Sequence, residues 1–421
     1  MGKGAVTGIA FVACMLAAWW TGYGHMLRHA PSACDFESYF LAAGVWRQDG
    51  NPYLPGQLAA AKTDAGDAPF PYLYTPPAAQ AVMPLASDTF LHAAQVWGTV
   101  NVCLYGICLF LCGLFCVRVS VRLGWTAGSP AGRAAVFLWA LVCGLLFPFP
   151  DTLRYGQINP AVLFFILLYL LFFTGGKRFW AGVFLGVAAV IKIVPVFLLL
   201  AHLRSGRSFF AGFLSGVLGV LLVSVAVFGP APWAEFAAAL PKFSYGTRVE
   251  GLWELSVPYN LALSGQLARL FHDDARAIFA GGMAAGLSVA AYFALSSKKI
   301  GQTFPALLLQ VSVAALLMVV FSPIAYFHHL VWLYPFLCCY GIFLFVYPLP
   351  RKPFRWAVYL LSMVLLLVNF TFRYHDFALT AALPFYFSVN TFGLFFLALL
   401  LGADARYMAG ITGGRFPGKD R

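Results

Sequence analysis

The segment INPAVLFFILLYLLFFTGGKR, residues 158–178, carries no charged residue before Lys177 and is apolar over nearly its whole length. An α-helix of about 20 such residues crosses a hydrocarbon core of about 30 Å. Comparable runs recur from end to end of the 421-residue chain, in which 61% of the residues are hydrophobic and 10% are charged. Because backbone polar groups in lipid must be satisfied within the protein, we predict an all-α polytopic membrane protein.

The apolar runs predict a bundle of about ten transmembrane helices. They lie at about 5–22, 90–116, 134–150, 158–174, 208–229, 276–295, 303–321, 329–349, 355–372 and 386–402. We interpret 1–421 as a single membrane domain, with an extracytoplasmic loop at 24–89 and a cytoplasmic tail at 403–421. Cleavage of the first span as a signal peptide is the alternative, but His25, Arg28 and His29 precede the candidate cleavage residues and argue against it.

Basic residues set the predicted orientation of these spans. With a cytoplasmic N-terminus, the short basic loops all fall on the cytoplasmic side: RVSVR (118–122), GGKR (175–178), RSGR (204–207), SSKK (296–299) and RKPFR (351–355). This is the pattern that the positive-inside rule predicts for a multi-pass protein of the inner membrane. The net charge of +12 therefore reflects topology, and we predict no nucleic-acid partner. Among the acids only Asp404 and Asp420 fall inside, so chemistry that needs carboxylates is expected on the extracytoplasmic side.

Two features inside the membrane need separate interpretations. Cys108, Cys112 and Cys116 share one helix face, but no His or acid accompanies them, so we interpret them as packing residues. The segment 179–203 lies between two basic loops and is too short for two full crossings. Its centre, VIKIVP, holds Lys192, so we predict a re-entrant hairpin of two short helices. Lys192 either snorkels to an interface or belongs to a functional site.

The long outer loop contains the stretch DFESYFLAAGVWRQDGNPY, residues 35–53. Its apolar spacing predicts a short amphipathic helix that lies on the membrane, with Asp35 at the N-cap or in the first turn. Asp35 either caps this helix or acts in catalysis, and the two roles are compatible.

Several blocks resemble glycosyltransferase family 87 in order along residues 30–340. They are DFESYFLAAGVWRQDGNPY (35–53), FPYLYTPPAAQAVMPLA (70–86), RYGQINPAVLFF (154–165), AGVFLGVAAVIKIVPVFLLL (181–200), VPYNLAL (257–263) and FSPIAYFHHLVWLYP (321–335). The resemblance implies the GT-C membrane fold and a polyprenyl-phosphate-mannose-dependent mannosyltransferase activity. It also implies that Asp35 is the general base, which would take the proton of an acceptor hydroxyl as that hydroxyl attacks the anomeric carbon.

Further polar residues are candidates for substrate binding, each with a structural alternative. Glu37 ranks below Asp35 because it points to another face of the same helix. The remaining candidates are Lys192, His328, His329, Arg154, Gln157, Asn159 and Asn260. Asn159 and Asn260 could instead cap helices, and the two adjacent histidines are expected to point in different directions. We predict no metal and no other cofactor, because no second acid of a metal-binding pair stands beside Asp35 and a monophosphate donor has no diphosphate to coordinate.

The leading functional hypothesis is transfer of a hexose, expected to be mannose, from a polyprenyl-phosphate donor to an extracytoplasmic lipid or glycan acceptor. The main alternative is a transporter or flippase of lipid-linked sugars, because broken helices and an intramembrane lysine also mark transport sites. A structural partner in envelope assembly would explain the hydrophobicity but not the polar residues. In the outer loop at 373–377, His375 and Asp376 are either acceptor contacts or solvated residues.

Overall fold

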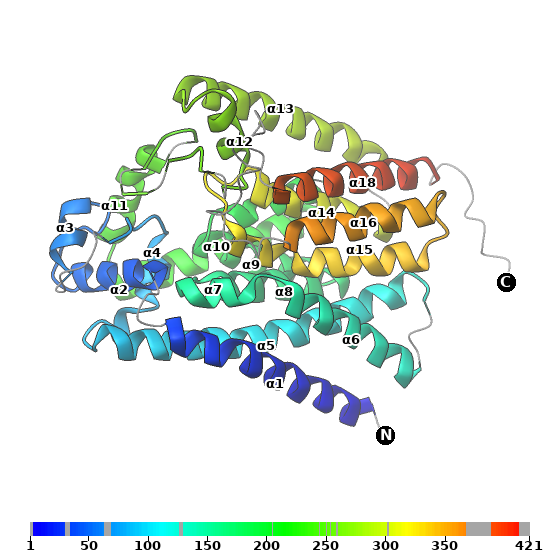
Figure 1. Cartoon of the computed structure of the whole chain (residues 1–421), viewed down its shortest axis with the longest axis horizontal. Helices are drawn as coiled ribbons and strands as arrows, with labels where there is room; N and C mark the ends of the chain where they lie inside the picture. The colour runs from blue at the N-terminus through cyan, green and yellow to red at the C-terminus, as the bar shows by residue number, and fades with distance from the viewer. Residues whose placement is uncertain are drawn as a thin grey trace, which may run out of the picture. The chain divides into compact units, whose positions relative to one another are not determined.

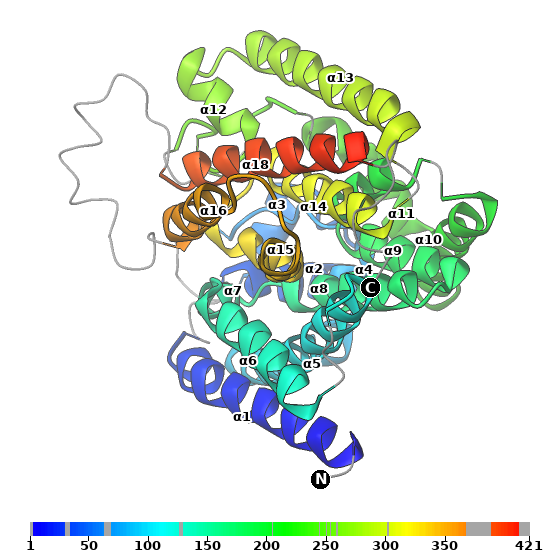
Figure 2. The same cartoon turned by 90° about the vertical axis from the view of Figure 1, so that its right-hand side faces the viewer.

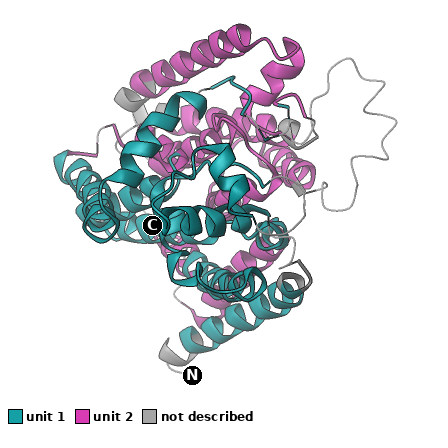
Figure 3. Ribbon diagram, turned by 90° about the vertical axis from the view of Figure 1, so that its left-hand side faces the viewer, with its two compact units in different colours: residues 1–113, 148–193, 207–254 teal, residues 114–147, 194–206, 255–421 magenta. Residues whose placement is uncertain are grey.

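The computed structural model describes residues 3–29, 34–62, 69–125, 129–203, 205–243, 245–249, 251–252, 254–257, 260–300, 303–367 and 389–411. Every regular element within these ranges is a helix (Figure 1). The prediction of an all-α membrane protein is therefore confirmed, while the loop at 373–377 lies outside the described residues. The chain divides into two compact units, which Figure 3 colours separately.

The first unit comprises Met1–Gly113, Pro148–Ile193 and Arg207–Glu254. Its elements are α1 (Lys3–His29), α2 (Cys34–Trp46), α3 (Pro55–Ala60), α4 (Pro76–Gln80), the 3₁₀ helix η2 (Met83–Leu85), the first part of α5 (Phe90–Arg122), α7 (Phe149–Tyr155), α8 (Asn159–Thr174), α9 (Arg178–Ile191), α10 (Arg207–Phe228), α11 (Ala231–Ala239) and η4 (Leu240–Phe243). Within it, α9 packs between α8 and α10 (Figures 1 and 2).

The second unit comprises Leu114–Phe147, Val194–Gly206 and Leu255–Arg421. It contains the end of α5, α6 (Pro130–Leu146), η3 (Val194–His202), α12 (Leu263–Leu270), α13 (Ala275–Ile300), α14 (Phe304–Val320), η5 (Phe327–Leu333), α15 (Tyr334–Val346), α16 (Lys352–Leu367) and α18 (Val389–Ile411). Within this unit, α16 and α18 lie side by side.

Long apolar helices agree with part of the predicted topology. Within the described residues, four helices have the length and hydropathy of a membrane span: Phe90–Arg122, Arg207–Phe228, Ala275–Leu295 and Phe327–Val346. The pair α6 and α7, bent by 47°, meets the same criteria when its two helices are taken together, as a broken span or a re-entrant loop. The predicted spans at 158–174 and 303–321 correspond to the shorter apolar helices α8 and α14. On α10, Leu222 remains 65% exposed, as expected of a side chain that faces lipid. The full count of about ten spans stays a prediction.

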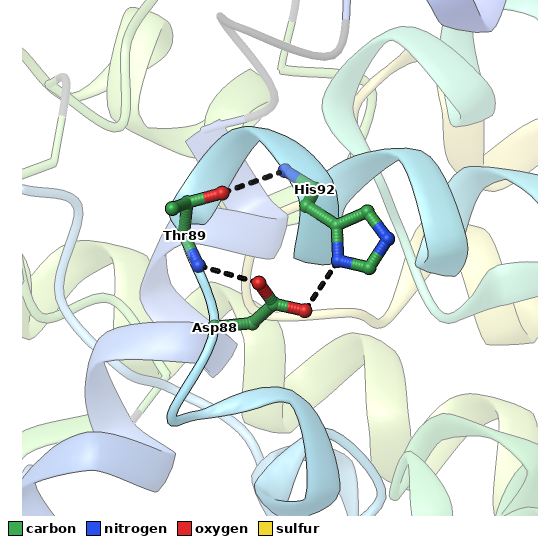
Figure 4. A network of polar contacts seen from close by, with 3 residues as sticks. All are labelled: Asp88, Thr89 and His92. Carbon is green, nitrogen blue, oxygen red and sulfur yellow. Dashed lines mark hydrogen bonds and ion pairs between the residues drawn. The ribbon is translucent and has the colours of Figure 1, made fainter.

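The start of α5 has a polar cap (Figure 4). Asp88 Oδ1 accepts a hydrogen bond of 2.8 Å from the Thr89 amide, and Thr89 Oγ1 accepts one of 3.4 Å from the His92 amide. The other oxygen of Asp88 pairs with the His92 ring, and this contact lowers the pKa of Asp88. These bonds satisfy backbone donors that the first helical turn leaves free, so we interpret the three residues as a helix cap.

One prediction from the sequence needs correction. The helix at the start of the 35–53 stretch exists as α2, but its buried residues include Phe36, Ser38, Tyr39 and Trp46 and cover several faces, so α2 is an enclosed helix rather than an amphipathic one on the membrane surface. α18 continues to Ile411, so the first part of the predicted tail is helical, while its cytoplasmic location stays a prediction. Asp404 in this helix is fully buried and accepts hydrogen bonds from Arg355 and Tyr340, which tie α18 to α16 and α15.

Four glycines allow α9 and α10 to pack closely. Gly182 and Gly186 on α9 face Gly212 and Gly216 on α10, and a Cβ at any of them would collide with backbone of the opposite helix. Such small residues at four-residue spacing let two helix backbones approach directly. The position of α9, and of the chain that follows it, therefore depends on residues without side chains.

We expect Gly182→Ala to lower the melting temperature of the purified protein, because overpacking of a close contact costs about 1–3 kcal/mol. The measurement is thermal unfolding in detergent. Gly219→Ala is the matched control: it changes a glycine in α10 that has open space around it. Equal melting temperatures for the two variants would contradict this account of the α9–α10 contact.

Candidate functional site

Asp35 is positioned by the first turn of α2. The helix is anchored at both ends: Phe36 is buried against Trp97 of α5, with ring centroids 5.8 Å apart, and Trp46 Nε1 donates a hydrogen bond of 2.8 Å to Glu235 of α11. Ser38 Oγ donates a hydrogen bond of 2.9 Å to the backbone carbonyl of Asp35. The Asp35 carboxylate therefore projects from a rigid element.

The loop FPYLYTPP, residues 70–77, is held by hydroxyl groups at both sides of Tyr74. Tyr53 donates a hydrogen bond of 2.8 Å to the Tyr74 carbonyl, and Tyr72 donates one of 2.7 Å to the Thr75 carbonyl. Thr75 Oγ1 lies 2.6 Å from the Val190 carbonyl and 3.0 Å from the Ile191 carbonyl. Because carbonyls at a helix C-terminus lack partners within the helix, this hydroxyl both caps α9 and brings Tyr74 to its end.

The turn between α7 and α8 places two amide side chains. Gly156 has a φ of 66°, and its amide bonds the Leu153 carbonyl while the Gln157 amide bonds the Thr152 carbonyl, a Schellman motif that favours glycine. Trp97 Nε1 donates a hydrogen bond of 2.7 Å to the Gly156 carbonyl. The turn therefore presents Gln157 and then Asn159, both of which are buried.

Five side chains from these elements meet in one polar cluster, which we call the Asp35 cluster: Asp35, Tyr74, Gln157, Asn159 and Lys192. The Tyr74 hydroxyl lies 3.3 Å from Asp35 Oδ1 and 3.2 Å from Gln157 Oε1. Lys192 Nζ donates to Asn159 Oδ1 at 3.0 Å and lies 3.5 Å from Gln157 Oε1. It also lies 5.3 Å from the centroid of the Tyr74 ring. A carboxylate, an ammonium and neutral hydrogen-bonding groups are thus combined in one place.

The structure distinguishes the interpretations of Lys192 and Asn159. Lys192 is the extended residue at which α9 ends, and η3 begins at Val194, so the predicted break in 179–203 is present. Its ammonium points to the cluster. Asn159 is the first residue of α8 and makes no side-chain cap, since its oxygen accepts from Lys192.

Burial changes the acidity of Asp35. The surrounding protein raises its pKa from 3.8 to about 6, an effect opposed by hydrogen bonds from Gln157 and Tyr74 and by the charge of Lys192. Asp35, Tyr74 and Lys192 nevertheless keep some exposed surface, whereas Gln157 and Asn159 are buried beneath them. The cluster therefore combines a carboxylate that is more basic than usual with a nearby cation, and both belong to residues that are only partly buried.

The other candidates from the first unit lie elsewhere. Glu37 pairs with Lys62, with Oε1 and Nζ 2.9 Å apart. Arg154 belongs to the last turn of α7 rather than to the start of α8, is exposed, and lies over the Tyr155 ring at 5.5 Å.

Asn260, His328 and His329 belong to the second unit. Asn260 donates to the Leu255 carbonyl and accepts from the amides of Ala262 and Ala325, so its side chain holds two backbone segments together. His329 Nδ1 accepts a hydrogen bond of 2.8 Å from the Tyr326 amide. The two imidazole rings lie 4.3 Å apart, so the expectation that they point in different directions is wrong.

Sequence reasoning did not single out Tyr74. Its block FPYLYTPP was conspicuous for aromatic and proline content, but several tyrosines stood in it and nothing in their spacing separated them. The distinction arises from contacts: Tyr72 bonds the backbone of its own loop, whereas Tyr74 reaches Asp35 and Gln157.

We expect the carbonyl band of a protonated carboxyl in the infrared spectrum to grow as the pH falls through about 6, because burial of Asp35 favours its neutral form. The measurement compares the reconstituted wild type with Asp35→Asn, and the component near pH 6 should be smaller in the variant. Identical titrations of the two proteins would show that Asp35 has an ordinary acidity.

Comparisons with known proteins extend the interpretation. The model of glycosyltransferase family 87 matches residues 72–323, a range that includes Tyr74, Gln157, Asn159 and Lys192. The chain is 29% identical over 319 residues to a polyprenol-phosphate-mannose-dependent α-(1-2)-phosphatidylinositol pentamannoside mannosyltransferase of Mycobacterium tuberculosis. The matched region covers 73% of this chain and 66% of that relative. It is 27% identical over 340 residues to a polyprenol-phosphate-mannose-dependent α-(1-2)-phosphatidylinositol mannoside mannosyltransferase of the same species, covering 79% and 75%. The pentamannoside enzyme of Mycolicibacterium smegmatis is 28% identical over 312 residues, covering 72% and 69%.

Proposed function

The chain belongs to glycosyltransferase family 87, and we propose that it transfers mannose from a polyprenyl-phosphate donor to a lipid or glycan acceptor at the extracytoplasmic face of the membrane. The donor class and the sugar are those of its relatives, which are named as polyprenol-phosphate-mannose-dependent mannosyltransferases of phosphatidylinositol mannosides. The observation that carries the proposal is the presence, in the Asp35 cluster, of a carboxylate of raised pKa together with the Lys192 ammonium.

In the proposed reaction, Asp35 is the general base. An acceptor hydroxyl attacks the anomeric carbon, a new carbon–oxygen bond forms there, and the bond from that carbon to the phosphate oxygen breaks. The hydroxyl proton passes to Asp35, and the lipid monophosphate leaves with the bonding electrons. A phosphate is already a stable leaving group, so one carboxylate suffices for the proton transfer. A general base works best when its pKa lies near the working pH, and burial raises the pKa of Asp35 toward that range.

Lys192 is assigned to the leaving phosphate. Negative charge on the phosphate grows as the bond to the sugar breaks, so a nearby ammonium stabilises the transition state more than the ground state. Asn159 and Gln157 hold this ammonium through their side-chain oxygens, at 3.0 and 3.5 Å. The Tyr74 hydroxyl lies between Asp35 and Gln157, and we assign it the role of positioning the Asp35 carboxylate.

We expect Asp35→Asn to lower the transfer rate by roughly 10²- to 10⁴-fold, because the amide cannot accept the hydroxyl proton. The measurement is transfer of mannose from a synthetic polyprenyl-phosphate-mannose donor to a phosphatidylinositol mannoside by the reconstituted protein. Asp49→Asn is the matched control: Asp49 is exposed just after α2 and has a φ of 56°, which asparagine tolerates well.

Transfer that survives Asp35→Asn would remove Asp35 from the role of base. Absence of transfer by the wild type with every polyprenyl-phosphate sugar tested, together with movement of the labelled lipid across the bilayer, would favour the flippase hypothesis.

The pH profile provides a second test. Asp35 must be ionised to accept a proton, so kcat/KM should rise with pH through about 6. The charge of Lys192 lowers the pKa of Asp35, so Lys192→Gln should move this rising limb to higher pH in addition to slowing the reaction. Lys242→Gln, which removes an exposed charge in η4, should leave the limb in place. If the rising limb of kcat/KM stays at the same pH in Lys192→Gln, the charge of Lys192 does not act on the general base, and this part of the proposal is wrong.

A further inference from the structure

An apolar cleft opens in the second unit between α6, α15 and α16. Its volume is about 270 Å³, and it is lined by Trp125, Ala135, Val136, Trp139, Gly341, Ile342, Phe345 and Trp356. Trp125 comes from the chain between α5 and α6, and its ring centroid lies 5.3 Å from that of Phe345. The lining combines the start of α6, the end of α15 and the start of α16, so the cleft lies at one end of these helices.

The walls of this tryptophan cleft suit an aliphatic chain. Trp139 Nε1 already donates a hydrogen bond of 3.1 Å to the Cys338 carbonyl, so its indole turns carbon surface to the cleft. Phe345 is 57% exposed, which leaves one wall open to the outside of the unit. In a bilayer this apolar exterior faces lipid rather than water. Tryptophan at such a boundary is typical of the interface between hydrocarbon and headgroups.

Basic residues surround the same end of the helices. Lys352 Nζ donates a hydrogen bond of 2.6 Å to the Phe345 carbonyl and lies 5.9 Å from the centroid of the Phe345 ring. Arg351 precedes it and is exposed. The acid Asp404 accepts a hydrogen bond of 2.6 Å from Arg355, so its charge is compensated there. Lys352 also opens α16, whose N-terminal amides add positive potential.

We propose that the tryptophan cleft binds one acyl chain of an anionic phospholipid, whose headgroup is held by Lys352 and Arg351. The positive-inside pattern assigns RKPFR, residues 351–355, to the cytoplasmic side, where anionic lipids are concentrated. A basic rim over an apolar slot between membrane helices complements both parts of such a lipid. The site belongs to the second unit and is independent of the proposed transfer reaction.

The test uses tryptophan fluorescence of the full chain in nanodiscs that contain phospholipids with brominated acyl chains. Brominated phosphatidylglycerol should quench more than brominated phosphatidylcholine at the same mole fraction, because the anionic lipid occupies the cleft preferentially. Lys352→Gln should reduce the preference about fivefold, as expected for one basic residue at an anionic surface. Arg406→Gln, which removes an exposed charge on α18, should leave the preference unchanged.

A second variant tests the cleft itself. Ala135→Phe places a ring in the space that the acyl chain would occupy and should abolish the excess quenching, while the exposed position of Ala135 keeps the substitution compatible with folding. Soluble glycerol phosphate should not compete, since it lacks the chain. Equal quenching by the two lipids, excess quenching that persists in Ala135→Phe, or competition by glycerol phosphate would each overturn the proposal.

Discussion

The Lys192 ammonium, 3.0 Å from the Asn159 side-chain oxygen, is the interaction on which the candidate site depends. A cation removed from water is stable only where oxygen atoms replace its hydration. This requirement joins the end of α9 to the start of α8. Those two segments meet where α9 packs between α8 and α10, and four facing glycines bring α9 close to α10. The site therefore needs the end of α9 beside the start of α8, so that side-chain oxygens contact the Lys192 ammonium.

The second constraint is the loop that carries Tyr74. Thr75 bonds the last carbonyls of α9, which satisfies acceptors that a helix end leaves free and at the same time sets the loop against Lys192. From there Tyr74 reaches Asp35 on α2. The bond from Thr75 caps the end of α9. The same bond places Tyr74, rather than another tyrosine of the loop, in the Asp35 cluster.

Each unit contains a group of buried polar side chains that bond one another, but the two groups have different roles. In the first, buried Gln157 and Asn159 support Tyr74 and Lys192, which are only partly buried. In the second, Asp404 is enclosed and fully engaged by Arg355 and Tyr340, so it contributes to helix packing rather than to binding. The difference between the two aspartates lies in access and not in residue type.

The all-α membrane architecture, the break at Lys192 and the position of Asp35 in the first turn of a helix were predictable from the sequence, because apolar run length, an intramembrane charge and a helix-start acid are local signals. The enclosed environment of α2 was not, since its packing depends on aromatic residues from other elements. Nor was the extent of α18, whose Asp404 resembles a tail residue until its partners on α15 and α16 are known.

The sequence alone determined where the chain is apolar enough for lipid and which polar residues interrupt it. Tertiary structure alone decided which of those residues meet. Glu37 and Asp35 are two positions apart on one helix, yet one pairs with Lys62 and the other joins Tyr74. The physical reason is that a hydrogen bond acts over about 3 Å, and whether two side chains come that close depends on the packing of helices distant in the chain.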